Sequence, residues 1–101
     1  PMRDFLFVED LAEACVFLIN NNFQFNVLNI GYGKDLSILD LAFLIKKIVG
    51  FTGSIKWDFS KPDGTPRKLL DISKINSLGW NAKTKLSEGI KKTYEWYIQN
   101  N

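Results

Sequence analysis

The sequence predicts an α+β domain in which short strands alternate with three to four helices. Segments with apolar residues at helical spacing alternate along the chain with short segments in which apolar and polar residues take turns. Of the 101 residues, 46% are hydrophobic and 14% aromatic, which is enough for a packed core. We therefore expect a single domain, residues 1–101.

Two helices are predicted with clear boundaries. In residues 38–49 the apolar residues form one stripe, Ser37 is a good N-cap, and Asp40 follows three positions later. Gly50 is well placed to end this helix, because glycine readily adopts the left-handed conformation. The other helix is predicted over residues 85–99, with one packing side formed by Leu86, Ile90, Tyr94 and Tyr97.

Two more helices are predicted, one before and one between those above. Residues 9–20 begin with acidic residues, which suit the positive end of a helix dipole. Their apolar stripe is expected to face the core, so Cys15 is interpreted as a small buried hydrophobic residue. A short helix, capped by Asp71 or Ser73, is expected to end at Gly79. The stripe of the first of these helices consists of Leu11, Ala12, Cys15, Val16 and Ile19.

Strands are predicted at residues 4–8, 25–30 and 54–59. In the last of these, Ile55, Trp57 and Phe59 would share one face. The glycines of "GYG", residues 31–33, lie between a predicted strand and a predicted helix, where a dinucleotide-binding loop would lie. The third glycine of that pattern would fall at Leu36, so the sequence favours a plain turn.

The loop at residues 60–68 combines turn residues with positive charge. Pro62 and Pro66 stiffen it, and "DG" at 63–64 is a turn dipeptide. This rigidity would fix the approach of Arg67 and Lys68, which suit a phosphate contact, although a solvated surface loop explains the same residues equally well. The apolar pair that follows, Leu69 and Leu70, is expected to anchor the loop in the core.

Composition excludes several classes of function. With 13 cations and 11 anions the net charge is only +2, which argues against nucleic acid as a partner. The single cysteine and the absence of histidine exclude an internal disulfide, thiol- and imidazole-rich zinc sites, and nucleophile systems that need histidine. No membrane-spanning run is present, and we expect a reducing, cytoplasmic location. A first residue other than methionine, Pro1, suggests a fragment.

Five segments of the chain together form a recognisable set. They are "PMRDFLFVEDLAEA", "LNIGYGKDLSILDLA", "SKPDGTPRKLLD", "SLGW" and "LSEGIKKTYEWY". In this order they resemble the C-terminal part of enzymes of the GDP-L-fucose synthase family, which are extended short-chain dehydrogenases/reductases. The resemblance covers essentially the whole chain, and "KPDGTPRKLLD" is its most specific part.

The resemblance implies a two-domain enzyme. An N-terminal Rossmann domain would bind NADP(H) and carry the serine, tyrosine and lysine of the reduction, while a cysteine and a histidine would serve epimerisation. None of these motifs is present here: no tyrosine has a lysine four residues later, and Cys15 lies in the wrong element. The chain therefore resembles the substrate-binding domain alone, which is expected to be inactive and to bind no cofactor.

The resemblance also predicts site residues. Arg3 matches the arginine of the family's "RDF"-type segment, which contacts the nucleotide-sugar, although the sequence alone fits an ion pair with a surface acid equally well. The proline-flanked loop matches the segment that closes over the substrate, so Arg67 and Lys68 would hold the diphosphate. Ser54 stands where some relatives carry a basic residue, which leaves open whether Lys56 replaces it. The full set is Arg3, Lys61, Asp63, Arg67 and Lys68.

The resemblance implies binding of a GDP-sugar by an enzyme that converts GDP-4-keto-6-deoxy-mannose into GDP-L-fucose. Epimerisation at C3 and C5 would precede reduction at C4, and the enzyme would be a homodimer paired through its other domain. Two alternatives stay open. In the first, the chain is the substrate domain of another nucleotide-sugar epimerase or dehydratase. In the second, it is an interaction module that binds no ligand.

Overall fold

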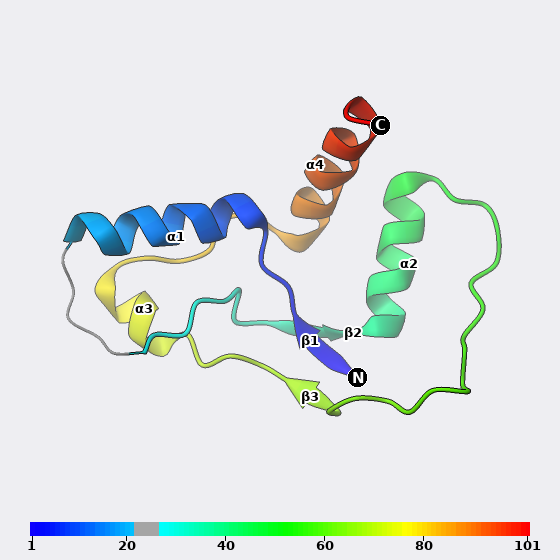
Figure 1. Ribbon diagram of the computed structural model, residues 1–101, viewed down its shortest axis with the longest axis horizontal. Coiled ribbons are helices and arrows are strands. Elements are labelled where there is room, and N and C mark those ends of the chain that lie inside the picture. Colours follow the sequence, from blue (N-terminus) through cyan, green and yellow to red (C-terminus); the bar gives the residue numbers. More distant parts are fainter. Residues whose placement is uncertain (22–26) are drawn as a thin grey trace.

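The computed structural model describes residues 1–21 and 27–101 (Figure 1). Four helices and a sheet of three very short strands make up the described part, which confirms the predicted α+β class. The elements in chain order are β1 (Met2–Asp4), α1 (Val8–Asn21), β2 (Asp35–Ser37), α2 (Ile38–Val49), β3 (Arg67–Lys68), α3 (Ser73–Leu78) and α4 (Leu86–Gln99).

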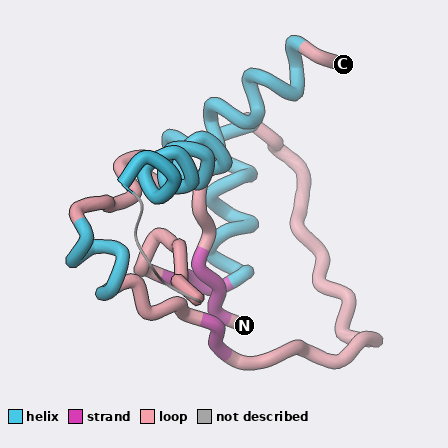
Figure 2. Tube along the Cα trace, turned by 60° about the vertical axis from the view of Figure 1, so that its left-hand side comes forward, coloured by secondary structure: helices cyan, strands magenta, loops and turns pink. Residues whose placement is uncertain are grey.

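The strand order in the sheet is β2-β1-β3, so the first strand of the chain is the central one. Strand β1 runs antiparallel to β2, where Arg3 lies opposite Leu36, and parallel to β3, where Arg3 lies opposite Lys68. Figure 2 shows the three strands meeting near the N-terminus, with the long loop of residues 50–66 leading from α2 to β3. The sheet thus joins three segments that are distant in sequence.

The helices gather in two groups, as Figure 1 shows, with α1 and α3 on one side and α2 and α4 on the other. The buried core lies with the first group and consists of Ala14, Ile75 and Trp80. Helix α2 packs mainly against α4 and β2. The molecule is flat, measuring 48 × 34 × 19 Å, and many large apolar side chains stay exposed.

Helix α2 begins and ends where its sequence predicts. The Ser37 hydroxyl oxygen accepts a hydrogen bond of 3.0 Å from the backbone N–H of Asp40, which satisfies a helix N-terminus. At the other end, Gly50 has φ +73° and donates its N–H to the carbonyl of Lys46. Helix α4, the extent of α1 and the end of α3 at Gly79 are also confirmed.

The prediction of which face of α1 is buried was wrong. Cys15 is exposed, as are Leu11, Val16 and Ile19, and the buried positions are Asp10 and Ala14. Asp10 is 1% exposed, and 2.9 Å bonds from the N–H and the hydroxyl of Thr84 to its two carboxylate oxygens compensate for the lost hydration. This long-range pairing, which orients α1 toward the segment before α4, has no signal in local periodicity.

The predicted strands were misplaced. Residues 4–8 are a strand only at Asp4, because α1 already begins at Val8 and the Phe7 carbonyl accepts from the N–H of Leu11. Residues 27–30 and 54–59 form no strand, and residues 25–26 lie outside the described part. An alternating pattern needs a partner strand for its backbone hydrogen bonds, and the sheet offers none to these segments.

The junction that leads from β3 into α3 also differs from expectation. Leu69 and Leu70 are 42% and 44% exposed, so they do not anchor the loop in the core. The Asp71 carboxylate accepts a 3.0 Å bond from the N–H of Ser73 at the start of α3, as expected of a capping side chain, although Ile72 occupies the cap position. Hydrogen bonds from the backbone and side chain of Ser73 lower the pKa of Asp71.

Candidate functional site

Three of the five predicted site residues meet at the β1–β3 pair. Arg3 is the register partner of Lys68, and Met2 is the partner of Arg67. Because successive residues of a strand point to opposite faces of the sheet, Arg3 and Lys68 share one face and Arg67 lies on the other. The three cations therefore surround the β3 edge of the sheet, and Arg67 and Lys68 do not point the same way.

Arg67 is held by an acidic residue of the far strand. Its Nε lies 2.6 Å from Oδ2 of Asp35, and its Nη2 lies 3.3 Å from Oδ1 of the same carboxylate. The pair spans the central strand, because β3 and β2 flank β1 on opposite sides. Asp35 was not among the predicted site residues, since a pairing across 32 residues leaves no mark in local sequence.

Arg3 fixes the end of the loop. Its Nη1 donates to the carbonyl of Thr65 at 2.7 Å and to that of Met2 at 2.8 Å. A side chain at Gly64 would place its Cβ 3.2 Å from Nη2 of Arg3, so the guanidinium packs closely against the loop. The N–H of Met2 adds a bond of 2.8 Å to the carbonyl of Pro66. Arg3 thus positions the loop instead of pairing with an acid.

The other predicted residues lie in the exposed part of the loop. Lys61 and Asp63 are exposed, as are Ser54 and Lys56, and none of the four belongs to a strand. Nearby, the side chain and backbone N–H of Ser60 donate to one carboxylate oxygen of Asp58, at 2.5 and 2.9 Å. These two bonds, the side-chain one first, lower the pKa of Asp58.

The "GYG" segment is a turn occupied by a carboxylate of the protein itself. The N–H groups of Tyr32 and Gly33 donate to Asp4 at 3.1 and 2.9 Å. Gly33 has φ +88°, which explains the glycine. These donors are therefore not available to a pyrophosphate, and the described residues offer no dinucleotide site at this loop.

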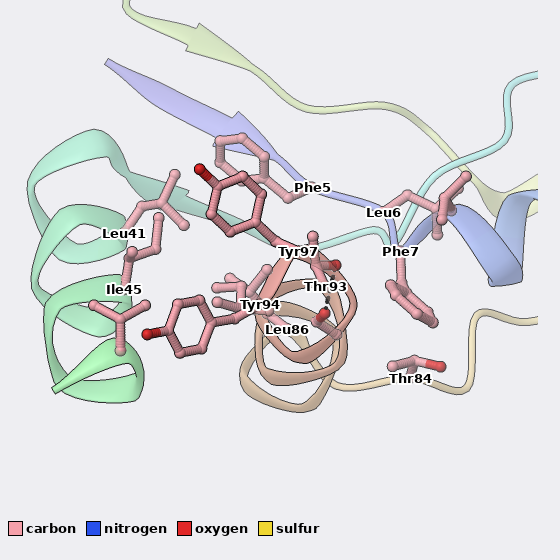
Figure 3. A pocket seen from close by; sticks show the side chains of 14 residues that line it. Phe5, Leu6, Phe7, Leu41, Ile45, Thr84, Leu86, Thr93, Tyr94 and Tyr97 are labelled. Atoms are coloured by element: carbon pink, nitrogen blue, oxygen red, sulfur yellow. Dashed lines mark hydrogen bonds between the residues drawn. The ribbon is translucent and has the colours of Figure 1, made fainter. Parts of the chain in front are cut away.

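A large cavity lies away from these cations. It has a volume of about 620 Å³ and opens between α2, α4 and residues 5–8. Figure 3 shows the side chains of Tyr94 and Tyr97 beside Leu41 and Ile45, as helical phase predicted for the two tyrosines. No charged residue lines the cavity, which makes it unsuitable for a diphosphate.

The described part of the chain holds neither a cluster of metal ligands nor a membrane-spanning helix. Among residues 1–21 and 27–101, no group of three or more histidine, cysteine, aspartate or glutamate residues is arranged to hold a metal ion. In the same part of the chain, every helix is too short or too polar to span a bilayer.

Comparison with known proteins identifies close relatives. The chain is 52% identical over 100 residues to GDP-L-fucose synthase 1 of Arabidopsis thaliana, which covers 99% of this chain and 31% of the relative. It is 42% identical over 109 residues to GDP-L-fucose synthase of Escherichia coli, covering 99% of this chain and 34% of the relative. No family model matches.

Solved structures agree with the sequence relatives. A GDP-6-OMe-4-keto-L-xylo-heptose reductase from C. jejuni superposes with a TM-score of 0.89 at 38% identity, over 99% of this chain and 32% of that one. MlghC, a GDP-mannoheptose C4 reductase from Campylobacter jejuni with NADP bound, superposes with a TM-score of 0.80 at 38% identity, over 96% of this chain and 32% of that one. This chain thus spans about a third of its relatives' length. It is homologous to that part of the GDP-L-fucose synthases, which are extended short-chain dehydrogenases/reductases.

Proposed function

We propose that this chain is the nucleotide-sugar-binding part of an NADP-dependent epimerase-reductase that makes GDP-L-fucose from GDP-4-keto-6-deoxy-mannose. The observation that carries the proposal is the gathering of Arg3, Arg67 and Lys68 at one strand pair, in a chain homologous to GDP-L-fucose synthases. Because β3 is an edge strand, Arg3 and Lys68 on one face and Arg67 on the other would hold the diphosphate at that edge through charge-assisted hydrogen bonds. Lys61 and Asp63, in the exposed loop, would approach the ligand from outside.

The chain would orient the sugar and would carry no hydride or proton transfer of its own. The glycine turn cannot hold the pyrophosphate of NADP(H), because its N–H groups already bind Asp4. We place the cofactor in a Rossmann domain, within the two thirds of the relatives that this chain does not cover. That domain would also pair two copies of the enzyme, and the lone cysteine suits a cytoplasmic location.

The experiment is a titration of GDP-mannose into the 101-residue chain, followed by amide chemical shifts. We expect saturable shifts at Arg3, Thr65, Arg67 and Lys68 at millimolar ligand, and none with mannose, which lacks the diphosphate. Shifts confined to the apolar cavity, or no shifts at all, would contradict the proposal and favour an interaction module that binds no ligand.

We infer further that the exposed apolar face of α1 packs against the Rossmann domain of the same polypeptide. Val8, Val16 and Ile19 are 68%, 56% and 78% exposed, a pattern that favours an interface over free surface. The relatives share this fold and are about three times as long. The comparison therefore supports the rest of such a longer enzyme as the partner that covers this face of α1.

Cys15 reports directly on this contact, because it is exposed on the same face. We expect iodoacetamide to modify Cys15 readily in the isolated chain and much more slowly in a two-domain enzyme that contains it. Mass spectrometry assigns the modified site, and a Cys15→Ser variant is the control. Equal rates in the chain and in the folded enzyme would show that the face stays uncovered.

A further inference from the structure

The ion pair between Arg67 and Asp35 uses only one edge of the guanidinium group. Both contacts come from Nε and Nη2, at 2.6 and 3.3 Å from the two carboxylate oxygens. A guanidinium carries five N–H donors in a planar fork. The end formed by Nη1 and the second hydrogen of Nη2 is therefore left to bind another oxyanion in bidentate fashion.

Exposure differs sharply between the two partners. The Asp35 side chain is 8% exposed, whereas that of Arg67 is 62% exposed. The carboxylate is thus the fixed part of the pair, since β2 leads directly into the well-capped helix α2. Asp4, its register partner on β1, is occupied separately by the backbone N–H groups of Tyr32 and Gly33. Asp35 is consequently available to Arg67.

We propose that Asp35 is a positioning residue that presents the free end of Arg67 to the diphosphate of the nucleotide-sugar, an inference that rests on the function proposed above. Without a partner, an arginine on a two-residue edge strand would lose much side-chain conformational entropy when it binds a ligand. The ion pair with Asp35 restricts the Arg67 side chain before binding, which removes most of that entropy loss. The negative charge of Asp35 stays buried behind the guanidinium, away from the phosphates.

The test is a double-mutant cycle on the Kd of GDP, measured in a full-length enzyme that contains these residues. We expect Asp35→Asn to raise this Kd about fivefold, because one long side chain is no longer held in place. The same change should leave the Kd of guanosine, which lacks phosphates, unaltered. Asp40→Asn is the matched control, since it removes one exposed carboxylate elsewhere.

The cycle separates this inference from the proposed function. In an Arg67→Ala background, Asp35→Asn should have no further effect on the Kd of GDP, because Asp35 acts through Arg67. If Arg67→Ala weakens GDP binding but Asp35→Asn does not, only the positioning role is wrong. Tighter GDP binding by the Asp35→Asn variant would show that Asp35 competes with the phosphates, and would also contradict the positioning role. If Arg67→Ala itself has no effect, the proposed site fails.

Discussion

Replacing Asp10 with alanine is expected to lower the free energy of unfolding by about 3 kcal/mol. Asp10 is almost wholly buried, and its carboxylate accepts two 2.9 Å bonds from Thr84. Alanine would leave the Thr84 N–H without a partner inside the protein, which is more destabilising than the loss of an exposed bond. The carboxylate also lies in the first turn of α1, where a negative charge is favourable.

The measurement is urea denaturation followed by tryptophan fluorescence, because Trp80 is only 5% exposed and lies in the core. Asp10→Asn should cost less than Asp10→Ala, since an amide oxygen still accepts from the Thr84 N–H. Glu95→Ala, which removes an exposed acid from α4, should change stability by less than about 0.5 kcal/mol. A loss for Asp10→Ala as small as that control would show that the buried pair does not hold α1 in place.

A neighbouring ion pair should contribute far less. Lys83 Nζ lies 2.6 Å from Oε2 of Glu13, and the hydrogen bond and charge of that carboxylate raise the pKa of Lys83. Both side chains are well exposed, at 71% and 44%, so solvent weakens their attraction. The link between α1 and the segment before α4 therefore depends on Asp10 and Thr84.

The helices were predictable where their end signals are local. Ser37 and Gly50 each bond to a residue within four positions, so the bounds of α2 can be derived from the sequence around them. The buried face of α1 could not be derived in this way. Apolar residues occur all round that helix, and the partner that selects its face, Thr84, lies 74 residues away.

For the strands and the site, too, features with a local sequence signal were predictable and features set by distant contacts were not. Two- and three-residue strands are too short for an alternating pattern, so β1 and β3 emerge only from their pairing. The family resemblance predicted Arg3, Arg67 and Lys68 as site residues, and the structure brings these three to one strand pair. The resemblance did not predict Asp35, because the contact of Asp35 with Arg67 crosses the sheet.

The second large effect is expected at Arg67. In a full-length enzyme that contains these residues, Arg67→Ala should weaken GDP-mannose binding by about 2 kcal/mol, roughly 30-fold in Kd, because a charge-assisted phosphate contact is lost. The Arg67 side chain is 62% exposed and one end of its guanidinium is free, so its removal should change binding much more than stability. Lys91→Ala, which removes one exposed cation from α4, is the matched control and should leave Kd unchanged.

The most direct test of the claim that this chain holds the nucleotide-sugar is therefore the ratio of the two dissociation constants, Arg67→Ala over wild type, measured by calorimetry with GDP-mannose. We expect a ratio of roughly 30 for Arg67→Ala and a ratio near one for Lys91→Ala. A ratio near one for both variants, in enzymes that remain folded, would contradict that claim.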